Sequence, residues 1–528
     1  GYPTSGSKPR SGGGYTQDFQ GGTITVAANG TATFTSTGAN GPHAAMANEA
    51  ATAPWLGGIN TPVVCGIVNG GCWQAFQNGV VMYSPTTGAR AVRSSIHQAW
   101  VRQGNENGWL GYPAGASQPS GGGYTQAFQG GTVAVDASGN ATFTGTGTTL
   151  AHAAIANVHT KDVGWLGATN TPIVCGTVSG GCWQAFQNGV IMYSPATGAR
   201  SVRSSVHQAW VTQQHENGWL GYPTGGSQPE NGGWTQTFQG GKVTVTGHGE
   251  VTFEGAGTTT PNAAIANAFR AAAWLGGTNT PVVCGIVNGG CWQAFQNGVI
   301  MYSPATSANA VRSDFHKAWV AQGNENGWMG YPTTPTICNI RDNGCWQAFQ
   351  GGPIIYSPTT GVQTMRSVVH KAWGTQGYEN GWLGYPTSSS RPAGNGYTQS
   401  FEHGSIAVDG NGIATFTNTG VSVAQAAIAN EYQAQLWLDH VNTPVVCGIR
   451  NGGCWQAFAN GVIMYSPGTG AVSVRSDIQQ EWVRMGNENG PLGYPTSRPQ
   501  QVGTGYTQTF QGGIITVDAN GAVTQLSQ

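Results

Sequence analysis

The heptapeptide Asn107-Gly-Trp-Leu-Gly-Tyr-Pro113 organises the whole sequence, because close copies of it recur about every 54 or 55 residues. Self-similarity at a fixed period of this order is the signature of tandem structural repeats. Counting each full copy, each shortened Trp-Leu version and the opening Gly-Tyr-Pro-Thr gives ten repeat units. The units begin at Gly1, Leu56, Leu110, Leu166, Leu220, Leu275, Met329, Leu383, Leu438 and Leu492.

The composition excludes several classes of protein. A chain of 528 residues is too long for one core, so a modular array is expected. Only 20 Lys+Arg and 21 Asp+Glu are charged, whereas Gly supplies 85 residues, a balance common in extracellular proteins. The net charge of -1 gives no attraction for nucleic acid. No apolar run approaches the roughly 18–20 residues of a membrane span. Because the chain begins inside a repeat motif, we expect further sequence upstream, such as a secretion signal.

The ten cysteines form five pairs with the same spacing, six residues between partners. Zinc sites space neighbouring cysteines more closely and need four ligands, so neither a metal nor another cofactor is predicted. Disulfides that close small loops fit this spacing, and each would stabilise the fold by about 2.5 kcal/mol. They indicate an oxidising compartment, so we expect a secreted or cell-surface protein. The predicted pairs are Cys65/Cys72, Cys175/Cys182, Cys284/Cys291, Cys338/Cys345 and Cys447/Cys454.

Two kinds of repeat alternate. The A type, seen in residues 1–55, has short β-rich runs separated by Gly-Gly and Asn-Gly turns, which predicts a three-stranded meander. A short helix is expected over Ala44–Ala51. The B type, seen in residues 56–109, carries the cysteine pair and further β-rich runs. A helix with Ser94 as its N-cap and Gly104 at its end is expected to follow.

The order of the two types suggests a duplication. Along the chain it is A, B, A, B, A, B, B, A, B, A, so the first five units match the last five at four of five positions. We therefore predict two five-repeat domains, residues 1–274 and 275–528, which are mainly β with one short helix per repeat. Strand alternation places Cys72, Gln74 and Phe76 on one face, the predicted core, and Trp73 on the other. The glutamine is expected to satisfy backbone groups, with a ring of ligand-binding glutamines as the alternative.

Three motifs resemble those of the LGFP repeat family of actinobacterial surface proteins: Leu110-Gly-Tyr-Pro113, Phe128-Gln-Gly-Gly131 and Tyr193-Ser-Pro-Ala-Thr-Gly198. The resemblance covers essentially the whole chain. It implies a non-catalytic module associated with the cell wall. It also implies that five repeats close into a propeller-like ring, hence two five-bladed rings here, with an open solenoid as the alternative. The sequence departs from the family pattern in its Tyr for Phe, its A/B alternation and its cysteine pairs.

Catalytic constellations are not supported by the sequence. Ser95-Ile-His97 has a nucleophile and a base, and His207, His316 and His370 recur at equivalent places, but the fifth copy has Gln479. No partner acid or oxyanion site accompanies them, so we expect no enzyme activity.

Two charged positions recur in the B repeats. One set precedes the helix and the other follows it, and we expect each Arg–Glu pair to brace its helix; carboxylates for glycoside hydrolysis are the alternative. These residues are Arg93, Arg203, Arg312, Arg366 and Arg475, with Glu106, Glu216, Glu325, Glu379 and Glu488.

Tryptophans are the best candidates for ligand contact. One in each B repeat lies on the strand face opposite the predicted core, next to Gln, Asn and Gly, a combination suited to stacking on sugar rings. Packing against the neighbouring repeat is the alternative. These candidates are Trp73, Trp183, Trp292, Trp346 and Trp455. The tryptophans that precede the leucine motif, such as Trp55, Trp109 and Trp219, are expected to anchor the joints between repeats.

The sequence therefore predicts a secreted, non-catalytic repeat protein that binds cell-wall polysaccharide of the arabinogalactan or peptidoglycan class through many similar sites. The alternative is a structural protein that binds copies of itself in a surface coat or fibre. Nucleic acid and membrane spans are not expected to be involved.

Overall fold

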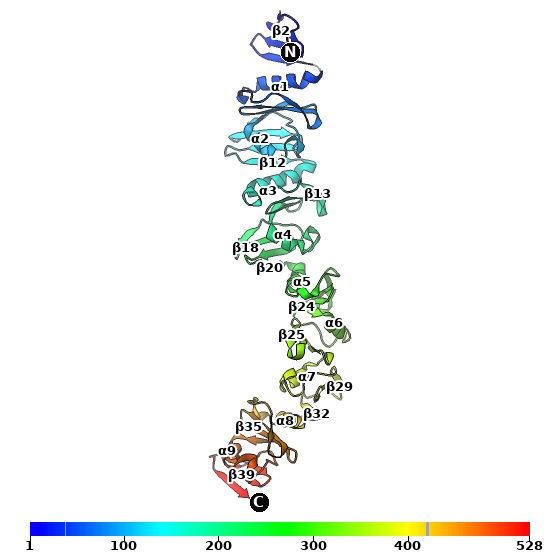
Figure 1. Cartoon of the computed structure of the whole chain (residues 1–528), viewed down its shortest axis with the longest axis vertical. Helices are drawn as coiled ribbons and strands as arrows, with labels where there is room; N and C mark the ends of the chain where they lie inside the picture. The colour runs from blue at the N-terminus through cyan, green and yellow to red at the C-terminus, as the bar shows by residue number, and fades with distance from the viewer. Residues whose placement is uncertain (37, 419–421, 528) are drawn as a thin grey trace. The chain divides into compact units, whose positions relative to one another are not determined.

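The computed structural model describes residues 1–36, 38–418 and 422–527. It consists of two compact units, Gly1–Ala263 and Ala264–Gln528. The described part of the chain is mainly β, with ten four-stranded antiparallel sheets, nine of which are followed by an α-helix (Figure 1). The division falls inside helix α5 (Thr260–Ala271), upstream of the predicted junction at 274/275. That each half folds alone stays a prediction.

The first B repeat shows how its type folds. Strands β5 (Val64–Ile67), β6 (Gly71–Phe76), β7 (Gly79–Ser84) and β8 (Gly88–Arg93) are adjacent in chain order. Tight turns join β6, β7 and β8, and the register pairs Cys65 with Cys72 across the first two strands.

The remaining B sheets repeat this order. They are β13 (Val174–Thr177), β14 (Gly181–Phe186), β15 (Gly189–Ser194) and β16 (Gly198–Arg203); β21 (Val283–Ile286), β22 (Gly290–Phe295), β23 (Gly298–Ser303) and β24 (Ser307–Arg312); β25 (Ile337–Ile340), β26 (Gly344–Phe349), β27 (Gly352–Ser357) and β28 (Gly361–Thr364); β33 (Val446–Ile449), β34 (Gly453–Phe458), β35 (Gly461–Ser466) and β36 (Gly470–Arg475).

The A repeats contain the predicted meander and one more short strand before it. This first strand contains Pro9 in one repeat and Pro119 in another, and it lies at the sheet edge, where proline is tolerated because its missing N–H faces outward. The A sheets are β1 (Lys8–Pro9), β2 (Gly14–Phe19), β3 (Gly22–Ala27) and β4 (Ala32–Thr35); β9 (Gln118–Ser120), β10 (Gly123–Phe128), β11 (Gly131–Val135) and β12 (Ala141–Gly145); β17 (Gln228–Glu230), β18 (Gly233–Phe238), β19 (Gly241–Val245) and β20 (Val251–Gly255); β29 (Arg391–Ala393), β30 (Gly396–Phe401), β31 (Gly404–Val408) and β32 (Ala414–Asn418); β37 (Gln500–Val502), β38 (Gly505–Phe510), β39 (Gly513–Val517) and β40 (Val523–Ser527).

A helix follows each sheet except the last in the described residues. The predicted helices after both sheet types are present, but Ser94 is not an N-cap: it is the first helical residue, and no side-chain cap is formed. Its backbone N–H instead donates to the Asn78 carbonyl at 3.0 Å, which ties the helix start to the β6–β7 turn. Besides α5, the helices are α1 (Gly41–Thr52), α2 (Ser94–Val101), α3 (Leu150–Leu166), α4 (Ser204–Val211), α6 (Ser313–Val320), α7 (Ser367–Gly374), α8 (Val423–Ala434) and α9 (Ser476–Arg484).

The helices of each unit lie between consecutive sheets, as α3 does between the sheets of β12 and β13 in Figure 1. Both faces of a B sheet are therefore covered. Cys72 and Phe76 pack under α1, whereas Val80 and Met82 pack with α2 and the next A sheet. Substantial packing between described elements joins only chain neighbours, so the predicted closure of five repeats into a ring is not found within either unit.

Disulfides join the first two strands of each B sheet, and the five predicted pairs are confirmed. In the first pair the Cα atoms of Cys65 and Cys72 are 4.1 Å apart, and each bond fastens an edge strand to its sheet. The bonded pairs are Cys65 with Cys72, Cys175 with Cys182, Cys284 with Cys291, Cys338 with Cys345, and Cys447 with Cys454.

The two cysteines of a pair differ in burial, because the first lies on the edge strand and the second on an inner strand. The first is exposed in every B repeat. The second belongs to the buried face, as the predicted core face requires, so it is no accessible site residue. The buried partners are Cys72, Cys182, Cys291, Cys345 and Cys454.

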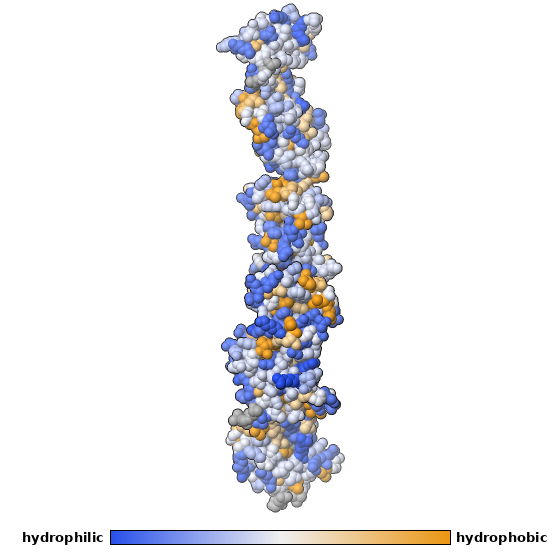
Figure 2. Space-filling view, turned by 90° about the vertical axis from the view of Figure 1, so that its right-hand side faces the viewer, coloured by the Kyte–Doolittle hydropathy of each residue, from blue (hydrophilic) through white to orange (hydrophobic). Residues whose placement is uncertain are grey.

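The five disulfides also indicate where the protein resides. Because disulfides of this kind persist in oxidising compartments and are rare in the cytosol, they indicate an extracellular protein. On the face shown in Figure 2, strongly hydrophobic residues form small separate patches among polar and weakly polar ones.

A buried glutamine fastens each repeat that follows a B repeat, and the prediction that it satisfies backbone groups is confirmed. Gln236 Nε2 donates to the Ser201 carbonyl of the preceding repeat at 2.9 Å and to the Gly225 carbonyl at 2.8 Å. Gln184, in a repeat that follows an A repeat, bonds only to Thr171 of its own repeat. The glutamine therefore links two repeats at one kind of joint and not at the other.

The recurring arginine does not pair with the recurring glutamate, so that prediction is wrong. Arg93 lies between the rings of Trp55 and Tyr124, 4.1 and 3.8 Å from their centroids, and so joins its repeat to the next. None of the ion pairs formed by described residues links the two recurring positions. The expectation that the motif tryptophans anchor joints is confirmed for Trp55, since cation–π contact holds it to this arginine.

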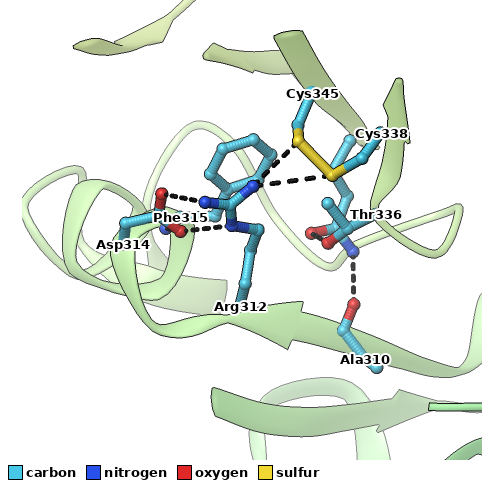
Figure 3. Close-up of polar contacts among 8 residues, drawn as sticks. Ala310, Arg312, Asp314, Phe315, Thr336, Cys338 and Cys345 are labelled. Atoms are coloured by element: carbon cyan, nitrogen blue, oxygen red, sulfur yellow. Dashed lines mark hydrogen bonds and ion pairs between the residues drawn. A yellow bond between two sulfur atoms is a disulfide. The ribbon is translucent and has the colours of Figure 1, made fainter. Parts of the chain in front are cut away.

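The joint between two successive B repeats differs from the joint between a B repeat and a following A repeat (Figure 3). The position of Tyr124 is occupied there by Cys345, and Arg312 Nη1 donates to its sulfur at 2.8 Å. Arg312 also forms two hydrogen bonds of 2.8 Å to the Asp314 carboxylate. A disulfide thus stands where the other joints have an aromatic ring, and the arginine also lies 5.2 and 5.0 Å from the ring centroids of Phe315 and Tyr356.

Candidate functional site

A pocket of about 500 Å³ opens beside the helix of the B repeat that starts at Leu275. Its floor includes Trp292 of β22 and Trp319 of α6. Its polar side includes Ser313, His316 and Lys317 of α6, together with Asn324 and Glu325 of the following turn. An aromatic surface beside a few polar groups is the usual composition of a small-molecule site.

Two further B repeats have the equivalent pocket. In the repeat that starts at Met329 it measures about 230 Å³ and is lined by Trp346, His370 and Glu379 among others. In the repeat that starts at Leu438 it measures about 310 Å³ and includes Trp455 and Glu488. The same arrangement of side chains thus recurs in several copies of one structural unit.

Local geometry brings these residues together. Trp292 faces Met301 across the β22–β23 pair, on the sheet face that the helix covers. His316 and Trp319 are three residues apart in α6, so they project from the same side of the helix, and their ring centroids are 6.0 Å apart. The turn after the helix then returns Glu325 to the same pocket.

The turn has an unusual backbone conformation. Asn324 has φ +56°, and the equivalent residues Asn105, His215, Tyr378 and Asn487 also have positive φ. Residues other than glycine adopt this region at a cost, and such positions cluster at functional sites. The Oδ1 atoms of the three asparagines are buried without a hydrogen-bond partner, so acceptor capacity is left beside the pocket.

The histidines at this helix position, of which His316 and His370 line described pockets, are neutral near pH 7. Burial lowers the pKa values of His97, His207, His316 and His370 below their ordinary value of 6.5. A neutral imidazole offers one donor and one acceptor to a ligand. In the last B repeat Gln479 stands at the histidine position. Its side-chain amide also offers one kind of donor and one acceptor, so it can replace a neutral histidine.

The glutamate is oriented by its neighbour. Glu325 Oε1 accepts a hydrogen bond from Asn326 Nδ2 at 3.2 Å, and Glu488 accepts one from Asn489 at 3.0 Å. Glu488 is only 8% exposed. Among the ion pairs of the described chain, none engages these two carboxylates.

A tyrosine below the site stays protonated. Burial first, and the charge of Glu325 second, raise the pKa of Tyr331 to about 12. The tyrosine hydroxyl therefore stays protonated and donates to the Val287 carbonyl at 2.5 Å.

The five candidate tryptophans match neither alternative alone, that is, neither free exposure to a sugar ring nor complete burial against the neighbouring repeat. Trp292, Trp346 and Trp455 are half-buried: they pack against the hydrophobic core, and they also line the pockets. Trp73 packs in the same way on the core of its repeat, and Trp183 is likewise half-buried. Whether they contact a ligand stays a prediction.

The recurring glutamate and the residue before it were not identified from the sequence as binding residues. The signal in the sequence is that both residues recur at a fixed distance after the helix, but the glutamate was assigned to an ion pair with the recurring arginine.

Within the described residues, no group of three His, Cys, Asp or Glu is placed to hold a metal ion. No helix in that part of the chain is long and apolar enough to cross a membrane.

The sheets, joints and disulfides define an extracellular tandem-repeat protein built from units of one sheet and one helix. The LGFP repeat matches the chain in six segments, which together cover more than half of it, so the chain belongs to the LGFP repeat family. All five B repeats and one A repeat are matched. The segments are residues 56–108, 166–218, 275–327, 329–381, 383–439 and 442–490.

A comparison with curated proteins finds no match. Among solved structures, the chain is similar to the extracellular domain of a hybrid two-component system of B. thetaiotaomicron, at 11% identity over 99% of this chain and 70% of that one, with a TM-score of 0.15. It is also similar to PorZ of Porphyromonas gingivalis, at 8% identity over 100% of this chain and 69% of that one, with a TM-score of 0.13. Scores this low carry no argument about fold or function.

Proposed function

We propose that the protein binds cell-wall polysaccharide, of the arabinogalactan or peptidoglycan class, through the pockets of its B repeats, and that it catalyses no reaction. The observation that supports this is the recurrence of one pocket, with a half-buried tryptophan beside a carboxylate, in the repeats of Trp292, Trp346 and Trp455. An indole face stacks on the C–H face of a sugar ring, while carboxylate and imidazole accept hydrogen bonds from hydroxyls.

Several weak sites on one chain raise the overall affinity when they can engage one polymer together. Each B repeat offers only one recurring carboxylate, whereas glycoside hydrolysis needs two across the scissile bond. The arrangement therefore favours retention of a polymer over its cleavage, and it suits a protein associated with the cell wall.

Replacement of the three pocket tryptophans tests this function. Trp292, Trp346 and Trp455 are changed together to alanine, and binding to actinobacterial cell wall is measured by pull-down. Loss of each stacking surface should cost about 1 kcal/mol, so the triple variant should bind at least tenfold more weakly. Trp274→Ala is the matched control, because this residue is 44% exposed and lies outside the described pockets.

A thermal melt of the same variants separates binding from packing. If wall binding is unchanged while the melting temperature falls sharply, these tryptophans serve only to pack the repeats, and the binding proposal is wrong. Replacement by phenylalanine, which keeps an aromatic ring in the core, should restore most of the stability and part of the binding.

Self-assembly into a coat or fibre is the second candidate. One apolar residue recurs at the start of each B edge strand and is 37–40% exposed: Val64, Val174, Val283, Ile337 and Val446. Edge strands with exposed apolar residues can pair with other chains. Sedimentation and negative-stain microscopy of the purified protein decide this: a monodisperse monomer at high concentration excludes the coat or fibre.

A further inference from the structure

The pocket of the repeat that starts at Met329 differs from its described equivalents in the identity of one aromatic residue. Four rings line it, and Glu379 is the only formally charged residue in its described lining. Tyr378 stands at the position that Asn324 occupies in the preceding repeat. The rings belong to Trp346, His370, Trp373 and Tyr378.

The tyrosine is placed to form an open side of this aromatic cluster. The ring centroid of Tyr378 lies 5.2 Å from that of His370 and 5.4 Å from that of Trp373, the latter in an edge-to-face arrangement. Tyr378 is 42% exposed, and its φ of +53° is costly for a bulky residue. A strained aromatic residue at the mouth of a pocket indicates a role that asparagine does not fill.

Glu379 gives the described lining of this pocket its one formal charge, which is negative. Glu379 Oε1 accepts from Asn380 Nδ2 at 3.1 Å. Arg341 lies nearby but does not pair with this carboxylate: its Nε pairs with Asp342 at 3.1 Å, and its Nη1 donates to the backbone carbonyl of Glu379. Burial lowers the pKa of His370, so this ring adds no positive charge near pH 7.

We propose that this pocket binds the ammonium group of an amino sugar whose nitrogen carries no acetyl group. The faces of Trp346 and Tyr378 attract a cation through their π electrons, and the Glu379 carboxylate supplies the opposite charge. The inference rests on the proposed function and narrows the ligand from polysaccharide in general to one with free amines.

Calorimetric titration of the full chain tests this inference, with a glucosamine oligosaccharide and its fully N-acetylated counterpart as probes, at a pH where the free amines are protonated. The deacetylated probe should bind more tightly. Glu379→Gln, which removes the charge and keeps the shape, should weaken its binding about five- to tenfold. Tyr378→Asn, which restores the residue of the neighbouring repeats, should weaken it as well.

Glu254→Gln is the matched control and should leave binding of the deacetylated probe unchanged, because this exposed carboxylate belongs to an A repeat and lies outside the described pockets. Equal binding of both probes, or no effect of Glu379→Gln in a variant with an unaltered melting curve, overturns the ammonium inference while the polysaccharide proposal stands. If wild-type protein binds the wall but neither probe, the inference is equally wrong. If it binds neither wall nor probe, the proposed function fails with it.

Discussion

Replacement of Gln236 by leucine should strongly weaken the joint between its repeat and the preceding B repeat. The side chain is 1% exposed and makes three hydrogen bonds. Its Nε2 donates to the carbonyls of Ser201 and Gly225 at 2.9 and 2.8 Å, and its Oε1 accepts from Ser227 Oγ at 2.7 Å. Leucine has a similar size and no polar atom, so the change removes the bonds without leaving a large cavity.

The expected cost follows from the groups left behind. Two buried carbonyls and one hydroxyl lose a partner, and each such loss costs about 1–3 kcal/mol when water cannot replace it. Because the hydroxyl can rotate toward another partner, we expect a total of about 3–5 kcal/mol. Gln184→Leu is the control: this half-buried residue makes one such bond, 3.1 Å to the Thr171 carbonyl, and should cost about 1 kcal/mol.

Urea denaturation followed by tryptophan fluorescence measures both variants on the full chain. Since repeat proteins lose stability mainly at the altered interface, the Gln236 variant should show an early transition that the Gln184 variant lacks. Equal losses in the two variants would show that the bond to the preceding repeat contributes nothing, and the distinction between the two kinds of joint would fail.

Three further changes have expected outcomes. Gly290→Ala places a Cβ 2.0 Å from the Tyr331 hydroxyl oxygen and should lower the free energy of unfolding by about 2–4 kcal/mol in thermal denaturation. The control is Gly285→Ala, whose Cβ has no atom within 4 Å; it should cost about 1 kcal/mol, because the φ of +93° alone disfavours alanine. Changing Cys284 and Cys291 together to serine should cost about 2.5 kcal/mol in urea denaturation, and the loss should disappear when wild type and variant are compared under reducing conditions. Because burial holds the pKa values of His97, His207, His316 and His370 below 6.5, the unfolded chain binds protons that the folded chain does not, so stability should fall as the pH falls below about 6.5. The quadruple His→Gln variant should lose much of this slope in melts at several pH values, and an unchanged slope would show that these histidines are not its source.

Much of each repeat could be predicted from local sequence. Gly-Gly and Asn-Gly turns between alternating runs predicted the three longer strands of the A sheets. The β-rich runs of the B repeats predicted β6, β7 and β8, and the spacing of Cys65 and Cys72 predicted their bond. The short first strand of the A sheets escaped prediction, since Gln118-Pro-Ser120 has no apolar alternation and is a strand only because β10 pairs with it.

The candidate site could be predicted only in part. The position of Trp292 on the face opposite Cys291 follows from strand alternation, but the helix that covers this face was not anticipated there. Glu325 was expected to meet Arg312, because opposite charges at fixed places suggest a pair. The arginine instead reaches the next repeat, where the Cys345 sulfur accepts its hydrogen bond. Contacts between repeats depend on packing that a single unit does not encode.

Hydrogen–deuterium exchange of the full chain, with and without solubilised cell-wall polysaccharide, tests the central claim most directly. Ligand in the B pockets should slow exchange in the turns that carry the pocket glutamates. These turns are residues 105–107, 215–217, 324–326, 378–380 and 487–489. The A-repeat hairpins, such as β10–β11, should not change. Protection of A-repeat peptides alone, or no protection at a polysaccharide concentration that saturates pull-down, would contradict the claim that the B pockets bind the wall.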